Sequence, residues 1–407
     1  MIQIKDKSAC CGCAACVQIC PKQCISLKED KEGFLYPTVN RNLCIECGKC
    51  ETVCPKLHSF EAHEPLKVFA AQHFDESARA ASSSGGIFTL LADAVINEGG
   101  VVFGARFDSD WSAIHDFTET HEGLQAFRGS KYLQSRIRNT YQQAEKFLKS
   151  GRQVLFTGTP CQIAGLKKYL RTDYDNLLAV DFVCHGVPSP LVWKKYLEET
   201  IACQCEKKSV LLHSNPLISE RGSIAHIHKR KIDTISFRNK DLGWKKYSFA
   251  LTLSEVTTIG EQNTVFLSTI FSENTYMQAF LANFSLRPSC YHCPVKGGKS
   301  GSDLTIGDFW GIEKIAPELD DDKGCSLIIA HTDKMMNWLE NNSILSEIPI
   351  QEEPFRSNLS YYTSPAQPAN RSFFFNQLIK NGFHEAWKNT VSTKLTDRVL
   401  RKIYHFL

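Results

Sequence analysis

The chain has 407 residues, of which 43% are hydrophobic and 22% are charged. This composition is typical of globular proteins, and the chain is long enough for two or three domains. Its 47 basic and 44 acidic residues give a net charge of +3, which offers no indication of a nucleic-acid partner, and we expect none. The first residues contain no apolar signal segment, and no stretch is apolar enough to cross a bilayer. We therefore expect a cytoplasmic protein whose 17 cysteines are metal ligands or free thiols rather than disulfides.

The first sixty residues contain two cysteine runs with the same spacing. Each run reads C-x2-C-x2-C-x3-C-P, first in "CCGCAACVQICP" and again in "CIECGKCETVCP". This spacing is typical of bacterial ferredoxins with two [4Fe-4S] clusters, in which the fourth cysteine of each run serves the other cluster. Zinc sites usually consist of two C-x2-C pairs, so the third cysteine of each run disfavours zinc. The predicted ligands are Cys10, Cys13, Cys16 and Cys54 for one cluster and Cys20, Cys44, Cys47 and Cys50 for the other.

The segment between the two runs, "ISLKEDKEGFLYPTVNRNL", predicts a β-hairpin. Gly33 is expected to supply the positive φ that its tight turn requires. Short helices are expected after Cys16 and Cys50, and the whole module is an internal duplication that depends on its inorganic clusters for stability. Two cysteines fall outside the repeated spacing, and we expect no ligand role for them: Cys11 and Cys24.

From residue 67 onward, strand and helix patterns alternate, which predicts a larger α/β or α+β body. Strands are expected in "LKVFAAQHF", "GGVVFGARF", "QVLF", "NLLAVDFV", "TISFRNKDLGWKKYSFALTL", "DLTIGDFWG" and "SLIIAHT". Helices are expected in "IFTLLADAVINEGG", with a cap from Ser82–Ser84, and in "QIAGLKKYL" after the turn "TGTPCQ". Ser189 and Pro190 suit the N-cap and first position of another helix.

Two turns of small residues, "SSSGG" and "TGTPC", each connect a strand to a helix and offer backbone N–H groups to a phosphate. Neither has the spacing of a Rossmann fingerprint or of a P-loop. Judged on these residues alone, each turn is more readily explained as structural than as a cofactor site.

Four further cysteines form a possible ligand set: Cys161, Cys184, Cys290 and Cys293. The first two follow expected strands, and the last two form one C-x2-C pair. From the residues alone two interpretations stay open, a third cluster or a redox or zinc C-x2-C accompanied by two ordinary buried cysteines.

In the part that contains these residues, the chain resembles the coenzyme F420 hydrogenase/dehydrogenase beta-subunit family. A two-cluster ferredoxin domain precedes this part. The stretches that carry the resemblance are "SSSGGIFTLLADAVINEG", "FRGSKYLQS", "FTGTPCQIAGLKKYL", "DFVCHGVPSP", "SLRPSCYHCPVKGGKSGSDLTIGDFWG" and "DDDKGCSLIIAHT". The resemblance implies a flavoprotein that binds FAD and exchanges electrons with iron–sulfur clusters. It also implies a third [4Fe-4S] cluster on the four further cysteines, and flavin or dinucleotide contacts at Gly85, Gly86, Lys131 and Thr159.

The resemblance implies less for other parts of the chain. Asp308 is expected to serve loop structure or cofactor contact rather than general-base catalysis. Residues 203–235 look like an insertion, in which a solvated loop is favoured over a metal site on Cys203, Cys205, His213, His226 and His228. The basic amphipathic stretch "KLTDRVLRKIYHFL" predicts a helix that packs on its own domain or touches a membrane surface or partner.

These expectations combine into one hypothesis, an iron–sulfur flavoenzyme that exchanges electrons between a small hydride-carrying substrate and a ferredoxin-like redox partner. The alternative is a non-catalytic electron-carrier or docking subunit, with a possible link to surface-polysaccharide synthesis. A zinc-dependent binding protein is the third possibility. The expected divisions are a two-cluster module over 1–60, the family region over 67–150 and 151–345, and a helical tail over 346–407.

Overall fold

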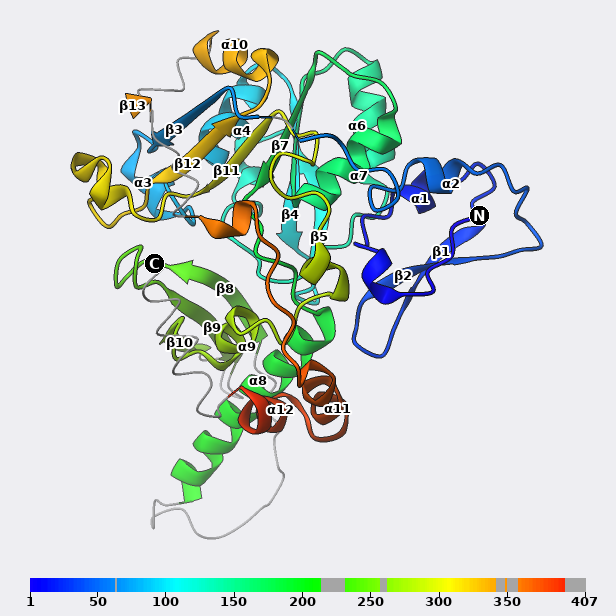
Figure 1. Cartoon of the computed structure of the whole chain (residues 1–407). Helices are drawn as coiled ribbons and strands as arrows, with labels where there is room; N and C mark the ends of the chain where they lie inside the picture. Colours follow the sequence, from blue (N-terminus) through cyan, green and yellow to red (C-terminus); the bar gives the residue numbers. More distant parts are fainter. Residues whose placement is uncertain (63, 214–230, 257–261, 342–347, 350–357, 392–407) are drawn as a thin grey trace.

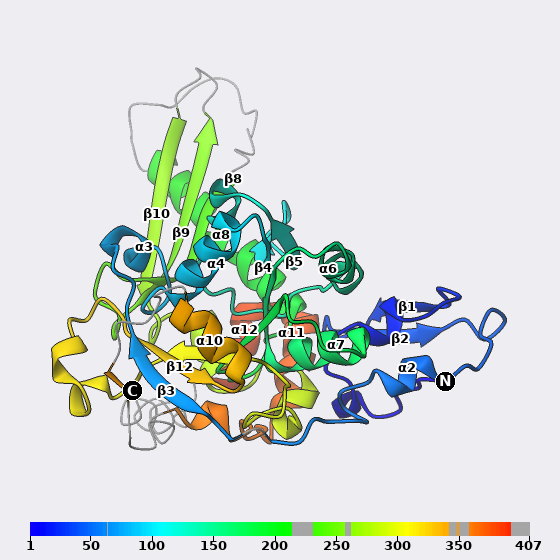
Figure 2. The ribbon, with the colours of Figure 1, turned by 90° about the horizontal axis from the view of Figure 1, so that it is seen from above.

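The computed structural model describes residues 1–62, 64–213, 231–256, 262–341, 348–349 and 358–391, and it contains three packed parts (Figure 1). The N-terminal module comprises η1 (Lys7–Ala9), α1 (Ala15–Gln18), β1 (Ile25–Glu29), β2 (Leu35–Val39) and α2 (Lys49–Thr52). It lies at one side of the molecule, and β9 and β10 project from another part (Figure 2).

The central part is built on an eight-stranded sheet with the order β13-β3-β12-β11-β7-β6-β4-β5. Its strands are β3 (Lys67–Ala71), β4 (Val101–Phe107), β5 (Ala113–Thr118), β6 (Val154–Gly158), β7 (Leu177–Phe182), β11 (Leu304–Asp308), β12 (Ser326–Ala330) and β13 (Ile348–Pro349). β4, β6, β7 and β11 are parallel, and β3 runs in the same direction because it and β11 both pair antiparallel with β12. The carboxyl ends of these five strands therefore meet at one edge of the sheet.

Helices cover both faces of this sheet. They are α6 (Thr140–Lys149) and α7 (Pro160–Leu170) on one face and α4 (Ile87–Asn97), α5 (His121–Leu124) and α10 (Asp333–Asn341) on the other. The connecting segments contain α3 (Glu76–Ala80) and the short 3-10 helices η2 (Pro288–His292), η3 (Ile312–Lys314), η4 (Pro317–Leu319) and η6 (Leu359–Tyr361). Val154 and Phe156 of β6 pack in the core with α6 and α7, whereas Leu155 packs in the core with α4 and α10. Burial on both faces explains the nearly continuous apolar runs of these strands.

The third part is an antiparallel sheet, β10-β9-β8, with helices packed against it. Its elements are α8 (Pro190–His213), β8 (Lys231–Asn239), β9 (Ser248–Val256), β10 (Gln262–Ile270), α9 (Thr275–Leu281), α11 (Arg371–Asn381) and α12 (Phe383–Thr390). In the described ranges, no helix combines the length and apolar character needed to cross a membrane.

The N-terminal module shares its core with the other two parts. Phe34 and Tyr36 of the hairpin are buried in the aromatic core formed with α8 and β9. On the other side of the module, Cys13 and Ala15 are buried against α7. Gly165 of α7 allows this close contact, because a Cβ atom there would lie 2.9 Å from the Cβ of Cys13. Packing with the body therefore supports the module in addition to any cluster that it holds.

The expected fold class, a mixed α/β body preceded by a small N-terminal module, is confirmed. Ser189 caps α8 as expected, because its Oγ accepts hydrogen bonds from the backbone N–H groups of Leu191 and Val192. The cap expected from Ser82–Ser84 is wrong, since α4 begins after Gly86, whose φ is +93°. Ser84 instead donates to the carbonyl of Cys325. The two short helices contain Cys16 and Cys50 rather than follow them.

The hairpin turn is the sequence feature that docks the N-terminal module on α8. Gly33 has the expected positive φ of +84°, and a Cβ atom there would lie 2.4 Å from the Cβ of Leu191. The side chain of Asp30 orders the turn by accepting hydrogen bonds from the backbone N–H groups of Glu32 and Phe34, each at 3.0 Å.

We expect Gly33→Ala to lower the free energy of unfolding by about 2–4 kcal/mol, because left-handed strain adds to a clash with α8. The control is Gly151→Ala, at a position with φ of +81° and no atom within 4 Å of an added Cβ. It should cost only the strain, about 1–2 kcal/mol. Urea unfolding of anaerobically prepared protein measures both values, and equal losses would contradict the docking role of the turn.

Candidate functional site

The cysteines predicted to hold one cluster line a common cavity at the outer end of the N-terminal module. Its empty space is about 360 Å³, and its wall includes Cys20, Cys44, Cys47 and Cys50. Cys24, for which we expected no ligand role, lies in the same wall, and its Sγ is 3.4 Å from the Sγ of Cys20. We name the four predicted ligands the outer set.

The other predicted ligands of the module, Cys10, Cys13, Cys16 and Cys54, form the inner set. They are neighbours in the structure. Burial raises the pKa of the Cys16 thiol, and the thiols of Cys10 and Cys54 lie close enough to raise this pKa further. A hydrogen bond with Cys11 is the main cause that raises the pKa of the Cys13 thiol, and Cys16 in turn contributes to raising it. The inner set lies on the side of the module that packs against α7, because Cys13 belongs to the core shared with that helix.

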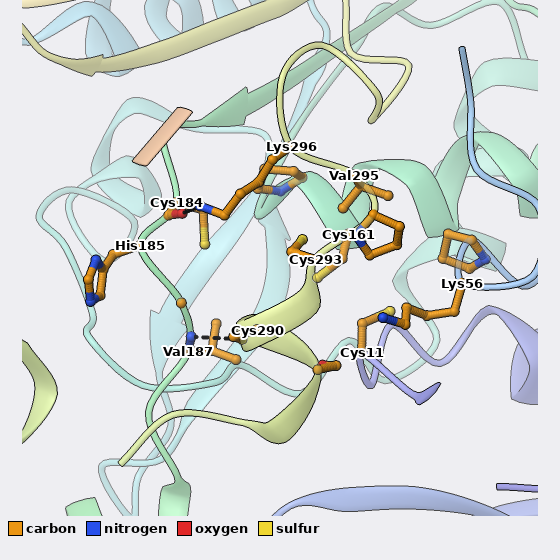
Figure 3. A pocket seen from close by; sticks show the side chains of 15 residues that line it. Cys11, Lys56, Cys161, Cys184, His185, Val187, Cys290, Cys293, Val295 and Lys296 are labelled. Atoms are coloured by element: carbon orange, nitrogen blue, oxygen red, sulfur yellow. Dashed lines mark hydrogen bonds between the residues drawn. The ribbon is translucent and has the colours of Figure 1, made fainter. Parts of the chain in front are cut away.

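The structure brings together all four cysteines of the possible third set, which we name the body set. Cys161, Cys184, Cys290 and Cys293 line one cavity with about 520 Å³ of empty space (Figure 3). Cys161 lies in the first turn of α7 and Cys184 follows β7, so the parallel pairing of β6 and β7 places both at the carboxyl edge of the sheet. The segment containing η2 adds the other two.

The environment of the body set suits thiolates that bind a metal cluster. Burial raises the pKa of Cys290 to about 11, so without a metal this thiol would remain neutral, and metal binding would release its proton. The backbone N–H of Val187 points at the Cys290 sulfur, 3.5 Å away. The buried ammonium of Lys296 lies in the same cavity wall and donates to the carbonyls of Cys184 and Ser360.

Cys11 is the residue whose place the sequence did not indicate. Its side chain is buried and lines the cavity of the body set (Figure 3). It also contacts the thiols of Cys13 and Cys161. It therefore lies between the inner set and the body set. Its position directly after a predicted ligand is the one signal that could have drawn attention to it.

The arrangement of these cysteines can be compared with the needs of a single metal ion. Across the described ranges, no three or more His, Cys, Asp or Glu side chains are arranged to hold one ion. The outer and body sets each surround a cavity, which suits a larger group better than one tetrahedral zinc ion.

The residues expected to contact flavin lie at or near the same carboxyl edge of the sheet, but they make internal contacts. A Cβ atom at Gly85 would lie 2.4 Å from the carbonyl oxygen of Ala71, so this glycine allows the turn before α4 to pack on β3. Thr159 caps α7 through a capping box with Gln162, and its Oγ1 is 3.2 Å from the Sγ of Cys161. Neither of the two cavities is lined by any of the four expected residues.

Lys131 has an unusual environment for a lysine. Its ammonium donates to the carbonyl oxygens of Ala126 and Arg128, each at 2.9 Å, and burial lowers its pKa to about 7. The neighbouring Ser130 donates to the Oγ of Ser83 and so ties this loop to the turn before α4.

Two donors that have no partner in the described part of the chain lie close to the start of α4. The Nδ1 of His73 accepts a hydrogen bond from the Asp75 N–H, so the neutral ring carries its proton on Nε2, which has no partner. This side chain is 7% exposed, and a Cβ atom at Gly86 would lie 3.5 Å from its Cδ2. The Nε of Arg128 is also buried without a partner in the described residues. Burial is the main cause that lowers the pKa of His73, and the nearby charge of Arg128 lowers this pKa further.

Asp308 has a structural role, one of the two roles expected for it. Its carboxylate accepts hydrogen bonds from the buried guanidinium of Arg238, at 3.0 and 3.2 Å, and from the indole N–H of Trp244, at 3.0 Å. The contact joins β11 to β8 and thereby the central sheet to the smaller one.

Two further predictions lie wholly or partly outside the described residues. Of the possible metal ligands in the insertion, only Cys203 has a described side chain, exposed on α8. The side chains of Cys205, His213, His226 and His228 and the terminal helix predicted in residues 394–407 fall outside the described part of the chain.

Comparison with known proteins gives two family matches and several matching solved structures. Residues 151–353 match the family defined by the C terminus of the coenzyme F420 hydrogenase/dehydrogenase beta subunit, and residues 9–57 match the 4Fe-4S dicluster domain. No curated protein matches the chain. A solved structure of the F420-reducing [NiFe] hydrogenase complex from Methanosarcina barkeri matches with 17% identity over 81% of this chain and 92% of that chain, at a TM-score of 0.41.

The family match covers α8, the smaller sheet and all four cysteines of the body set, and the dicluster match covers the inner and outer sets. The chain therefore contains, over residues 151–353, a member of the family defined by the C terminus of the coenzyme F420 hydrogenase/dehydrogenase beta subunit, preceded by a 4Fe-4S dicluster domain over residues 9–57.

Proposed function

We propose that the protein passes single electrons along three [4Fe-4S] clusters, held by the outer, inner and body sets in that order. Family membership already indicates an oxidoreductase-type protein with iron–sulfur clusters. The observation that carries the finer proposal is the convergence of four cysteines from distant segments on one cavity wall that Cys11 of the N-terminal module also lines. Such a series suits one-electron transfer, for which neighbouring clusters must lie close together.

The outer set is the proposed point of exchange with a partner protein. Cys47 is exposed, and the two apolar side chains beside the predicted ligands, Leu43 and Ile45, are 55% and 57% exposed. Lys22 and Lys49 line the same cavity, and neither forms an ion pair with another described residue. An apolar patch beside these two cations fits an acidic redox protein, whose approach the charges would favour.

We further propose that a flavin, FAD, binds at the carboxyl edge near the start of α4. The unpartnered Nε2 of His73 and the guanidinium of Arg128 would hold a phosphate together with the N-terminus of α4. The exposed ring of Phe74 beside His73 offers a surface for stacking. A bound flavin would supply the exchange between two-electron chemistry on a hydride-carrying substrate and one-electron transfer to clusters.

A second candidate is an electron-carrier subunit without its own substrate. It is favoured by one observation: Gly85, Gly86, Lys131 and Thr159 make internal contacts and line neither cavity. For either candidate we propose a cytoplasmic location, because none of the sixteen cysteines with described side chains forms a disulfide.

The cluster count is the first test. Protein purified without oxygen should contain about twelve irons and as many sulfides per chain, as expected for three [4Fe-4S] clusters. Cys184→Ser and Cys290→Ser should each lower this to about eight irons, because they remove ligands of the body set alone.

Cys325→Ser is the matched control for the cluster count. Cys325 is more deeply buried than Cys184 and Cys290, and its thiol donates to the carbonyl of Ala71, away from the three sets. The iron content should therefore not change. About eight irons in the unsubstituted protein, unaffected by Cys184→Ser, would refute the third cluster.

The flavin proposal predicts that Arg128→Gln weakens FAD binding about tenfold or more, since a charged hydrogen bond contributes about 1.5–3 kcal/mol. Fluorescence titration of the flavin-free protein with FAD measures this. Arg138→Gln is the control, because Arg138 is a half-exposed arginine paired with Asp108. If the unsubstituted protein binds no FAD, the electron-carrier candidate is favoured. If Arg128→Gln binds FAD as tightly as the unsubstituted protein, the proposed flavin site at the start of α4 is refuted.

A further inference from the structure

We propose that Arg287 is a positioning residue that joins the body to the inner set and raises the reduction potential of the cluster held there. This inference rests on the proposed assignment of Cys10 as a ligand of that cluster. It does not depend on a third cluster or on a flavin.

Arg287 reaches from the body into the N-terminal module. Its Nη2 lies 3.6 Å from the Sγ of Cys10, and its Nε donates to the carbonyl oxygen of the same residue at 2.7 Å. Further hydrogen bonds run from Nη2 to the Leu35 carbonyl, at 2.9 Å, and from Nη1 to the Oε1 of Gln134, at 2.8 Å. Every branch of the guanidinium is therefore fixed, and one branch points at a predicted ligand sulfur.

The close approach of Arg287 depends on Gly12. A Cβ atom at this residue would lie 2.9 Å from the Nη1 of Arg287 and 2.7 Å from the Nε2 of Gln134. The φ of Gly12 is +76°, a conformation that glycine adopts without strain. The loop between the first two ligands of the module therefore leaves space for the arginine.

Among the described residues, the charge of Arg287 has no carboxylate partner. The residue is 0% exposed, and none of the described carboxylates forms an ion pair with it. The rings of Tyr36 and Phe34 face the guanidinium, with centroids 4.3 and 5.3 Å from its central carbon. A buried cation is costly unless a negative group compensates it. A cluster ligated by the Cys10 thiolate would provide that negative charge at the observed position.

The same short segment also serves the body set. Arg287 precedes Cys290 by three residues, and its carbonyl accepts a hydrogen bond from the Cys290 N–H at 2.9 Å. The backbone N–H of Arg287 donates to Val187, in the loop that follows Cys184. A displacement of this arginine would therefore affect the wall of the body set as well as the inner set.

The electrostatic consequence has a definite sign. Reduction adds one negative charge to a cluster, and a nearby cation with an N–H···S hydrogen bond stabilises the reduced form more than the oxidised form. Arg287 should therefore raise the potential of the inner cluster relative to the outer one. An electron entering at the outer set would then reside preferentially next to the body set.

The test is a redox titration of the full-length, cluster-loaded protein, followed by electron paramagnetic resonance. Arg287→Gln should lower the midpoint potential of one cluster of the module by at least 59 mV, the value for a tenfold change in a one-electron equilibrium. Arg287→Lys keeps the charge and should lower the potential by less. If the glutamine variant loses its cluster, the potential measured for the lysine variant provides the test.

Arg371→Gln is the matched control. Arg371 is 5% exposed and also joins the body to the module, through Glu32 at 3.0 and 2.7 Å, but it contacts none of the predicted ligands. Its substitution should leave both potentials of the module unchanged. Unchanged potentials in both Arg287 variants, or an equal shift in Arg371→Gln, would overturn the proposal. Iron content measured on the same samples separates this outcome from loss of the third cluster.

Discussion

The proposed transfer of electrons through a series of clusters would require the protein to hold those clusters close together, and one packing contact meets this requirement. The cysteine loop of the N-terminal module lies against α7, at the edge of the sheet where β6 and β7 end. Cys13 packs on Gly165, and Cys11 reaches the cavity of the body set. The module is thus part of the body's core, and its inner and outer sets face different environments, one buried and one near solvent.

Sequence reasoning predicted those features that local residue patterns determine. The repeated cysteine spacing predicted the inner and outer sets, and the structure places the residues within each set close to one another. Gly33 indicated the hairpin turn, where its φ is positive as expected. The strands of the central sheet were recognisable because burial on both faces demands continuous apolar runs. The resemblance to a family added the body set, which the residues alone left as one of two interpretations.

The remaining features depend on contacts between segments far apart in the chain. Cys11 gains its position only when α7 packs against the module, and Arg287 meets Cys10 across 277 residues. Nothing local distinguishes either residue from an ordinary buried side chain. One helix cap shows the same limit: a cap from Ser82–Ser84 was expected for α4, but Ser84 donates to a carbonyl beside β12 instead. Tertiary partners decided each of these cases.

The central claim, that three cysteine sets hold three clusters in series, is tested most directly by the anomalous scattering of iron in crystals grown without oxygen. The account predicts three peaks above the iron absorption edge: one among Cys20, Cys44, Cys47 and Cys50, one beside Cys10, and one between Cys161 and Cys290. A map with no iron peak in the body cavity, or with a peak that appears only at the zinc edge, would contradict it.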